Sequence, residues 1–109
     1  SNGDAQEPVR LKLYRDGSEE AWAGLTVNPG FEVYSQPLPG IGEKSLILNA
    51  PGGELTIEYF IDGNWVEARS QALSSGTTVL SISDNAALIR FRYKAREPGL
   101  IRAASFTLI

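Results

Sequence analysis

Apolar and polar residues alternate with a period of two along most of the chain, in short runs that end at Gly, Pro, Asn or Asp. This alternation is typical of β-strands that have one face buried and the other in water. No stretch shows a convincing helical periodicity, although a single helical turn over 18–23 is an alternative there. The pattern predicts strands over 9–14, 21–27, 31–35, 45–48, 54–61, 64–68, 78–83, 87–95 and 100–109.

Short strands at regular spacing, separated by turn residues, are typical of sandwiches and barrels. The sequence therefore predicts an all-β fold, an antiparallel two-sheet sandwich of the jelly-roll or related Greek-key type with about eight to nine short strands. Segments 36–42 and 70–77 are predicted to be loops. Residues 1–8 are small, polar and acidic, and we expect them to form a flexible N-terminal arm. Residues 9–109 then make a single β-sandwich domain.

The clearest alternation lies in segment 87–95. Three apolar side chains alternate there with three cations, in the order Ile89, Arg90, Phe91, Arg92, Tyr93 and Lys94. A shift of one residue would bury the three cations, each at a cost of several kcal/mol, so the register of this strand is strongly determined. The same alternation in other strands completes a predicted core: Leu11, Leu13, Leu46, Leu48, Ile57, Ile61, Leu80 and Ile82.

Asp62-Gly63 is the strongest hairpin signal in the chain. If these two residues form the whole loop, Phe60 faces Trp65 and Glu58 faces Glu67 on the outer face of the sheet. The residues predicted on the opposite, buried face are Ile57, Tyr59, Ile61, Val66 and Ala68. Like charges opposite one another destabilise a strand pair, so this register needs Arg90, Arg92 or an outside partner nearby. A three-residue loop would instead pair Phe60 with Val66 and bury both.

The composition excludes several classes of function. The 109 residues include no Cys and no His, which excludes disulfides, thiol catalysis, Ser-His-Asp triads and the usual zinc and haem sites. The formal charge of −3 argues against a nucleic-acid partner, and the absence of a long apolar run argues against a membrane partner, so we expect neither. The charge is uneven, because residues 85–109 carry five basic residues and one acidic residue. Ion pairs between neighbouring strands of one sheet would account for this uneven charge, and so would a surface that is complementary to a second copy of the chain.

The remaining candidates for chemistry are weak. Glu58 and Glu67 could sit at the separation of a glycosidase pair, but a sandwich of 109 residues offers little surface from which to build a cleft. Segments 16–20 and 62–64 carry oxygen ligands of the kind calcium uses, although turn formation explains both. The glycine patterns lack the residues of a phosphate-binding loop. We therefore expect no enzyme activity, no catalytic residue, no cofactor and no metal.

Recognition by surface side chains is the remaining possibility. The candidate partner-binding surface is made up of aromatic and charged residues expected on one outer face: Phe60, Trp65, Glu58, Glu67, Arg90, Arg92 and Lys94. Most of the other aromatic residues, which include Trp22, Tyr14 and Tyr34, are expected in the core.

The second half of the chain resembles small β-sandwich virion proteins of tailed bacteriophages, of the head-decoration (cement) or tail-associated type. The resemblance covers 54–109. It rests on the strand 54–59 followed by Asp62-Gly63-Asn64-Trp65-Val66, on segments 78–82 and 88–93, and on the closing strand that begins at Pro98. It implies a structural protein of the virion, made in the host cytoplasm, which binds capsid or tail subunits and forms a homo-oligomer. An apolar edge strand at 100–109 would suit strand addition to a neighbour.

Two alternatives remain open, because one sandwich fold can serve several functions. The first is a carbohydrate-binding module of a secreted enzyme, in which Trp65, Phe60 or Trp22 stacks on a sugar ring. The second is an extracellular adhesion domain.

Overall fold

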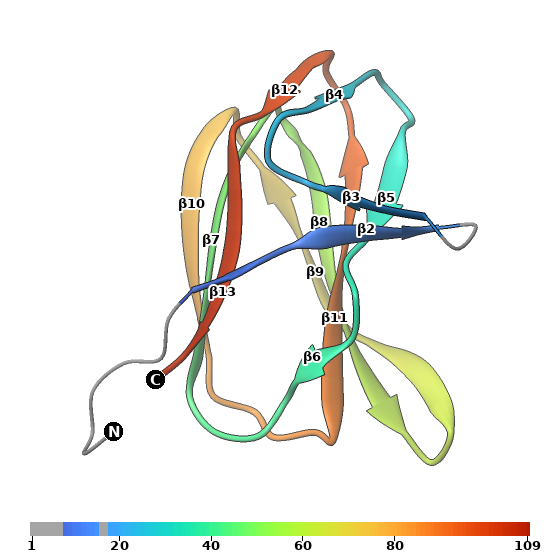
Figure 1. Cartoon of the computed structure of the whole chain (residues 1–109), viewed down its shortest axis with the longest axis vertical. Coiled ribbons are helices and arrows are strands. Elements are labelled where there is room, and N and C mark those ends of the chain that lie inside the picture. The colour runs from blue at the N-terminus through green and yellow to red at the C-terminus, as the bar shows by residue number, and fades with distance from the viewer. Residues whose placement is uncertain (1–7, 16–17) are drawn as a thin grey trace.

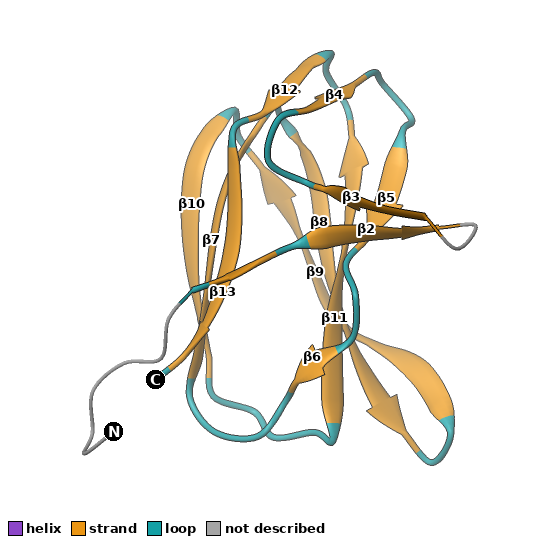
Figure 2. Cartoon of the chain, viewed as in Figure 1, coloured by secondary structure: helices purple, strands orange, loops and turns teal. Residues whose placement is uncertain are grey.

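The computed structural model describes residues 8–15 and 18–109, and these form an all-β protein of antiparallel strands (Figures 1 and 2). The described part of the chain has no helix that is long and apolar enough to cross a membrane. The predicted arm 1–8 lies outside the described residues apart from Pro8, which is exposed. The side chains of the calcium candidate 16–20 lie outside them as well.

Two main sheets carry the fold. Sheet 1 has the strand order β1 (Val9–Arg10), β13 (Ala103–Leu108), β7 (Lys44–Ala50) and β10 (Gly76–Ile82). Sheet 2 has the order β5 (Glu32–Tyr34), β11 (Leu88–Ala95), β8 (Gly53–Ile61) and β9 (Asn64–Leu73), and the short β6 (Leu38–Pro39) also pairs with β11. Two small ribbons complete the structure: β2 (Lys12–Arg15) with β3 (Ser18–Ala21), and β4 (Leu25–Val27) with β12 (Gly99–Ile101).

The strand order is that of a jelly roll. With the two small ribbons and β6 set aside, eight strands remain in the two sheets. The first of them pairs with the last (β1 with β13), the second with the seventh (β5 with β11), the third with the sixth (β7 with β10) and the fourth with the fifth (β8 with β9). Strands at the two ends of the sequence thus pair with each other, and so on toward the middle of the sequence, with the pairs alternating between the two sheets. This is the double-sheet jelly-roll arrangement. The predicted fold class is therefore confirmed.

The core lies between the two sheets and agrees closely with the predicted one. Leu11, Leu46, Ile57 and Ile89 are at most 1% exposed, and the rings of Phe91 and Phe106 meet between the sheets at 6.0 Å. Burial of these side chains is the main favourable contribution to folding. Two predicted core residues differ, because Leu80 is only partly buried and Ile61 is 46% exposed.

The prediction for Ile61 is wrong because the β8–β9 hairpin extends beyond the sandwich, at the lower right of Figure 1. A register irregularity after Ile57 pairs Glu58 with Glu67 and Ile57 with Arg69, which leaves Ala68 without a partner. This β-bulge bends the strand away from sheet 1. The face that was predicted to be buried is consequently exposed at Ile61, Val66 and Ala68.

Three predicted strands are broken because their halves pair with different neighbours. Segment 9–14 divides at the buried Leu11, where the chain leaves β13 and comes beside β5 through the bridge between Leu13 and Ser35. Segment 21–27 divides at a turn, and no helical turn forms there. Segment 100–109 divides at Arg102 into β12, which pairs with β4, and β13, which pairs with β7.

The two predicted loops contain strand. Only Ser74 and Ser75 separate β9 from β10, so most of segment 70–77 is strand. Its small polar residues are compatible with a strand at a sheet edge, where the hydroxyls of Ser70 and Thr56 form a hydrogen bond of 2.7 Å across the pair. Within 36–42, the short β6 pairs with β11.

Lys44 is a fully buried cation that the sequence pattern does not identify. Its Nζ donates hydrogen bonds to the backbone carbonyls of Gly40, Gly42 and Asp84, at 2.8, 2.5 and 2.7 Å. Three donors therefore meet three acceptors, and the ammonium joins the loop before β7 to the loop after β10.

We predict that Lys44→Met destabilises the protein by at least about 2 kcal/mol, because the apolar chain leaves three carbonyls without their donor. Urea unfolding measures the change. Lys94→Met, at an exposed position, is the matched control and is expected to change stability by less than about 0.5 kcal/mol. Equal effects of the two substitutions would contradict the structural role of Lys44.

Tyr93 is a buried phenol whose hydroxyl donates a hydrogen bond of 2.7 Å to the carbonyl of Pro51. Burial raises the pKa of Tyr93 to about 12, and the negative charge of Glu97 adds to the rise. Because the folded state holds this proton more tightly than the unfolded state, the resulting stability is complete below the ordinary tyrosine pKa of about 10. It is lost as the pH rises through about 12.

We therefore predict a late tyrosinate transition, near pH 12, in an absorbance titration at alkaline pH. Tyr93→Phe should remove that transition and lessen the fall in stability between pH 10 and 12. If the variant retains the full late transition, the assignment to Tyr93 is wrong.

Candidate functional site

The outer face of sheet 2 carries a regular arrangement of opposite charges. β11 directs Arg90, Arg92 and Lys94 outward because its apolar residues Ile89, Phe91 and Tyr93 fill the core. In the register of the sheet, Arg90 lies opposite Glu58 and Lys94 lies opposite Glu54 of β8. The central strand therefore places its cations beside acids of its neighbours.

The Asp62-Gly63 hairpin has the predicted two-residue loop. Both residues have positive φ, 51° and 82°, which is the conformation of a type I′ turn. Phe60 pairs with Trp65 and Glu58 pairs with Glu67, as the sequence predicts. The alternative three-residue loop, which would bury Phe60 against Val66, is not formed.

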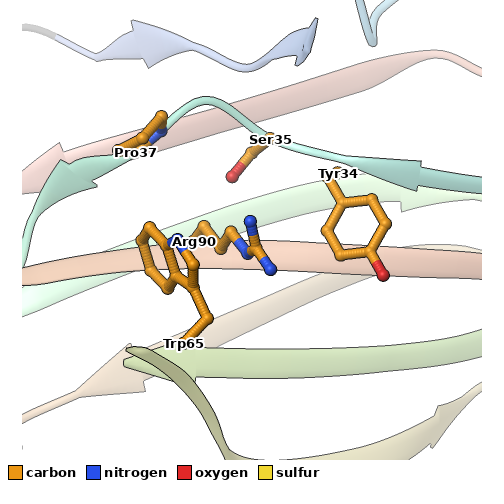
Figure 3. A pocket seen from close by; sticks show the side chains of 5 residues that line it. All are labelled: Tyr34, Ser35, Pro37, Trp65 and Arg90. Carbon is orange, nitrogen blue, oxygen red and sulfur yellow. The ribbon is translucent and has the colours of Figure 1, made fainter. Parts of the chain in front are cut away.

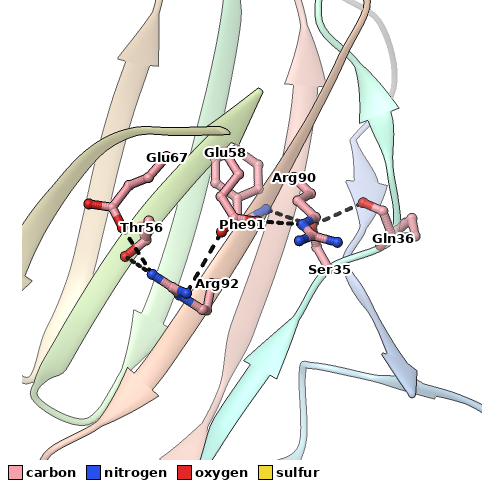
Figure 4. Close-up of polar contacts among 8 residues, drawn as sticks. All are labelled: Ser35, Gln36, Thr56, Glu58, Glu67, Arg90, Phe91 and Arg92. Carbon is pink, nitrogen blue, oxygen red and sulfur yellow. Dashed lines mark hydrogen bonds and ion pairs between the residues drawn. The ribbon is translucent and has the colours of Figure 1, made fainter. Parts of the chain in front are cut away.

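Two arginines pair with the facing glutamates, and Arg92 contacts both of them (Figure 4). Glu58 is only 7% exposed, and its Oε1 accepts a hydrogen bond of 2.5 Å from Nε of Arg90. Arg92 lies between the acids, 3.7 Å from Glu58 and 3.2 Å from Glu67, and it also donates to the hydroxyl of Thr56. The basic neighbours that the like-charged pair requires are therefore the two that were predicted.

Arg90 is held between two aromatic rings. Its guanidinium carbon lies 4.3 Å from the ring centre of Trp65 and 4.7 Å from that of Tyr34. Phe60 contacts Trp65 edge-on, with ring centres 5.3 Å apart. An arginine stacked on aromatic rings and fixed by a buried carboxylate has little freedom to move. We call Tyr34, Glu58, Phe60, Trp65 and Arg90 the stacked cluster.

A hollow of about 390 Å³ opens beside the stacked cluster (Figure 3). It is lined by Tyr34, Ser35, Pro37, Trp65 and Arg90. Three strands supply this lining together with the segment between β5 and β6, so its position follows from the pairing of β11 with β5, β6 and β8.

The structure brings together six of the seven residues predicted for the surface. Phe60 and Trp65 are partly buried, Arg90 and Arg92 are about one-quarter exposed, and Glu67 is 58% exposed. Lys94 is the exception, because it lies further along β11. It lines a separate hollow of about 380 Å³ with Pro29, Gly30, Gly53, Glu54, Ala95 and Arg96.

Sequence reasoning did not place Tyr34 and Pro37 at the surface. The outward position of Tyr34 follows from the alternation in β5, where Val33 and Ser35 are buried. Its closeness to Arg90 depends on the pairing of β5 with β11, which a local pattern does not reveal.

A hydrogen bond with Tyr34 raises the pKa of Arg92, burial opposes this effect, and the charges of Glu58 and Glu32 support it.

The side chains of this face are held in place by ion pairs and ring contacts. Arg92 occupies the space between Glu58 and Glu67, which a substrate would need if the two glutamates acted as a glycosidase pair. Within the described residues no group of three or more acidic side chains is arranged to hold a metal ion.

The fold and the site together define the chain as a jelly-roll β-sandwich with an aromatic and charged surface on one sheet. No family model matches the chain. Over 76 residues it is 33% identical to a phosphoglycerate kinase of Pseudothermotoga lettingae. The aligned segment covers 69% of the chain and 19% of the kinase. The chain therefore spans about a fifth of the length of this curated relative.

We predict that Arg90→Ala destabilises the protein by about 2 kcal/mol or more, because it removes the closest partner of a buried carboxylate and two ring contacts. Lys94→Ala, on the same strand but outside the stacked cluster, is expected to cost less than about 0.5 kcal/mol. Urea unfolding compares the two variants. An Arg90→Ala variant no less stable than Lys94→Ala would show that the stacked cluster adds nothing to the fold.

Proposed function

We propose that the chain is a non-enzymatic structural protein of a bacteriophage virion, of the capsid-decoration (cement) or tail-associated type, which stabilises the particle by protein–protein contacts. The outer face of sheet 2 is the proposed contact surface for capsid or tail subunits. The observation that carries this assignment of the surface is Arg90, held between Tyr34 and Trp65 and fixed by Glu58. The virion class comes from the resemblance of segment 54–109.

The stacked cluster has the composition of an interface hot spot. Trp, Tyr and Arg are the residue types that contribute most to protein–protein binding when they lie together in a desolvated position. Here they are ordered before any partner arrives, so binding loses little side-chain entropy. The hollow beside Trp65 provides a concave place for a side chain of the partner.

The surrounding charges fit a polar rim. Glu67 is 58% exposed and Arg92 one-quarter exposed, so both remain accessible at the border of the cluster. A rim of this kind determines orientation and specificity more than affinity. A decoration protein also gains from repetition, because binding only the assembled shell stabilises that shell at every site.

A carbohydrate-binding module is less well supported by this geometry. A sugar platform needs an open aromatic face, whereas the guanidinium of Arg90 covers the ring of Trp65 and Phe60 lies against it. Trp22, another platform residue considered from the sequence, is fully buried.

Phosphoryl transfer does not form part of the proposal. That chemistry uses cationic groups that are available to neutralise phosphate oxygens. In the described part of the site, Arg90 and Arg92 are instead paired with Glu58 and Glu67.

The test is co-sedimentation of the purified chain with phage particles that lack it. Wild-type protein is expected to pellet with the particles, and Trp65→Ala is expected to weaken binding by about 2 kcal/mol, or roughly thirtyfold. Val66→Ala is the matched control, because Val66 is its neighbour on β9 and points to the opposite face. Circular dichroism verifies that both variants fold.

Wild-type protein that stays in the supernatant at micromolar concentration would overturn the proposal. Affinity electrophoresis in polysaccharide gels tests the alternative. Retardation that Trp65→Ala abolishes would favour a carbohydrate-binding module over a virion protein.

A further inference from the structure

The edges of the two sheets differ in how well they are protected against pairing with another chain. Sheet 1 ends at the two-residue β1 and at β10, and sheet 2 ends at the short β5 and β6 and at β9. The ten-residue β9 contains a bulge and the charged residues Glu67 and Arg69. Shortness, bulges and charges are the usual means by which proteins prevent edge strands from pairing.

β10 lacks all three forms of protection. It has seven residues, Gly-Thr-Thr-Val-Leu-Ser-Ile, with no charge and no proline, and it pairs with β7 in a continuous register from Gly76 to Ile82. Its one strand neighbour among the described residues is β7. On its open side, Arg69 reaches the carbonyl of Ser81 at 3.5 Å, which covers one end of the strand.

Exposed apolar side chains accompany this open edge. Val79, at the centre of β10, is 62% exposed, and its cross-strand partner Ile47 is 39% exposed. Both lie on the outer face of sheet 1. The strand therefore offers unpaired backbone groups and an apolar centre at the same place.

The strand inferred from the sequence to be suited to strand addition is not available for it. Segment 100–109 contains β13, which lies between β1 and β7 in the interior of sheet 1, and β12, which pairs with β4. Any strand addition to sheet 1 beside the long strands must therefore occur at β10.

We propose that β10 pairs with β10 of a second copy of this chain, antiparallel and across a twofold axis at Val79. This pairing joins the two copies of sheet 1 into one continuous sheet. It places Thr77 opposite Ser81 of the partner subunit, Thr78 opposite Leu80 of the partner subunit, and the two Val79 side chains opposite each other. A twofold contact of this kind uses the same surface on both subunits.

The side chains of β10 are complementary to those of β10 in a second copy, which favours this copy as the occupant. The chain has a formal charge of −3, so two copies repel each other in general. No charged side chain of β10 meets its counterpart in the proposed pairing, since the strand contains none. At its centre the two Val79 side chains and the two adjacent Ile47 side chains form one apolar group, and Thr77 meets a serine hydroxyl.

The proposal goes beyond the proposed function and does not depend on it. The dimer contact lies at the edge of sheet 1, whereas the stacked cluster lies on the outer face of sheet 2. The two are tested with different variants and different partners, so failure of one is distinguishable from failure of the other.

Sedimentation velocity over a range of concentrations tests the proposal. The wild-type chain is expected to show a species of twice its mass of 11.8 kDa, whose population increases with concentration. Val79→Lys places two like charges face to face and should weaken self-association by about tenfold or more. Ile41→Lys is the matched control, because Ile41 is 69% exposed and outside β10, and it should self-associate like the wild type.

Cross-linking tests the register directly. The chain has no cysteine, so Val79→Cys introduces a single thiol. Opposed side chains in an antiparallel pair lie about 4.5–5.5 Å apart at Cβ, near the range of a disulfide, so mild oxidation should give a covalent dimer rapidly. Ile41→Cys should give one only slowly.

Three outcomes would overturn the proposal. They are a mass of 11.8 kDa at every concentration, a dimer that Val79→Lys leaves unchanged, and cross-linking of the two cysteine variants at equal rates. Thermal unfolding of Val79→Lys verifies that any loss of the dimer does not come from loss of the fold.

Discussion

The structure depends on the way in which β11 lies in the centre of sheet 2. Its odd-numbered residues Ile89, Phe91 and Tyr93 are completely buried, so the cations between them must face outward. A shift of one residue would bury charges at a cost of several kcal/mol each, and no alternative register competes. Glu58 of β8 is then almost buried beside Arg90, and its charge is acceptable there because the arginine lies at 2.5 Å. One strand thus determines the core on one side and the candidate surface on the other.

The same strand explains why the surface is rigid. An arginine side chain in water has many conformations, but Arg90 is confined by Glu58 and by the rings of Tyr34 and Trp65, which come from β8, β5 and β9. Each of these strands is fixed by backbone pairing, so the position of the arginine is determined by the sheet and not by its own flexibility. Ordered aromatic and guanidinium groups are what a protein partner recognises with the least loss of entropy. Arg92 lies between Glu58 and Glu67 and pairs with both, so the two acids are held by cations of the same sheet.

The sequence predicts those features that depend on neighbours along the chain. Alternation identifies the buried face of β11, and Asp62-Gly63 determines the hairpin register that pairs Phe60 with Trp65. Features that depend on distant segments are not predictable in this way. Leu11 and Arg102 interrupt predicted strands because the chain changes pairing partners there, and no local signal marks the change. Ile61 has the pattern of a core residue, but its environment is decided by how far the hairpin extends beyond sheet 1. Lysine is usually a surface residue, but Lys44 is buried because its ammonium donates hydrogen bonds to three backbone carbonyls from two loops.

The two sheets have different physical characters, which bears on how the molecule meets other molecules. On sheet 2, Arg90 and Arg92 pair with Glu58 and Glu67, so this surface carries little net charge. A partner that binds there contacts mainly the aromatic rings. At the edge of sheet 1, β10 contains no charge at all and leaves backbone groups unpaired. Side-chain recognition on one sheet and backbone pairing on the other draw on different interactions, and a substitution in one changes the other only through the shared core. The proposed dimer contact at an edge and the proposed partner contact on a face therefore use separate surfaces, and the layer of buried side chains between the sheets holds both in place.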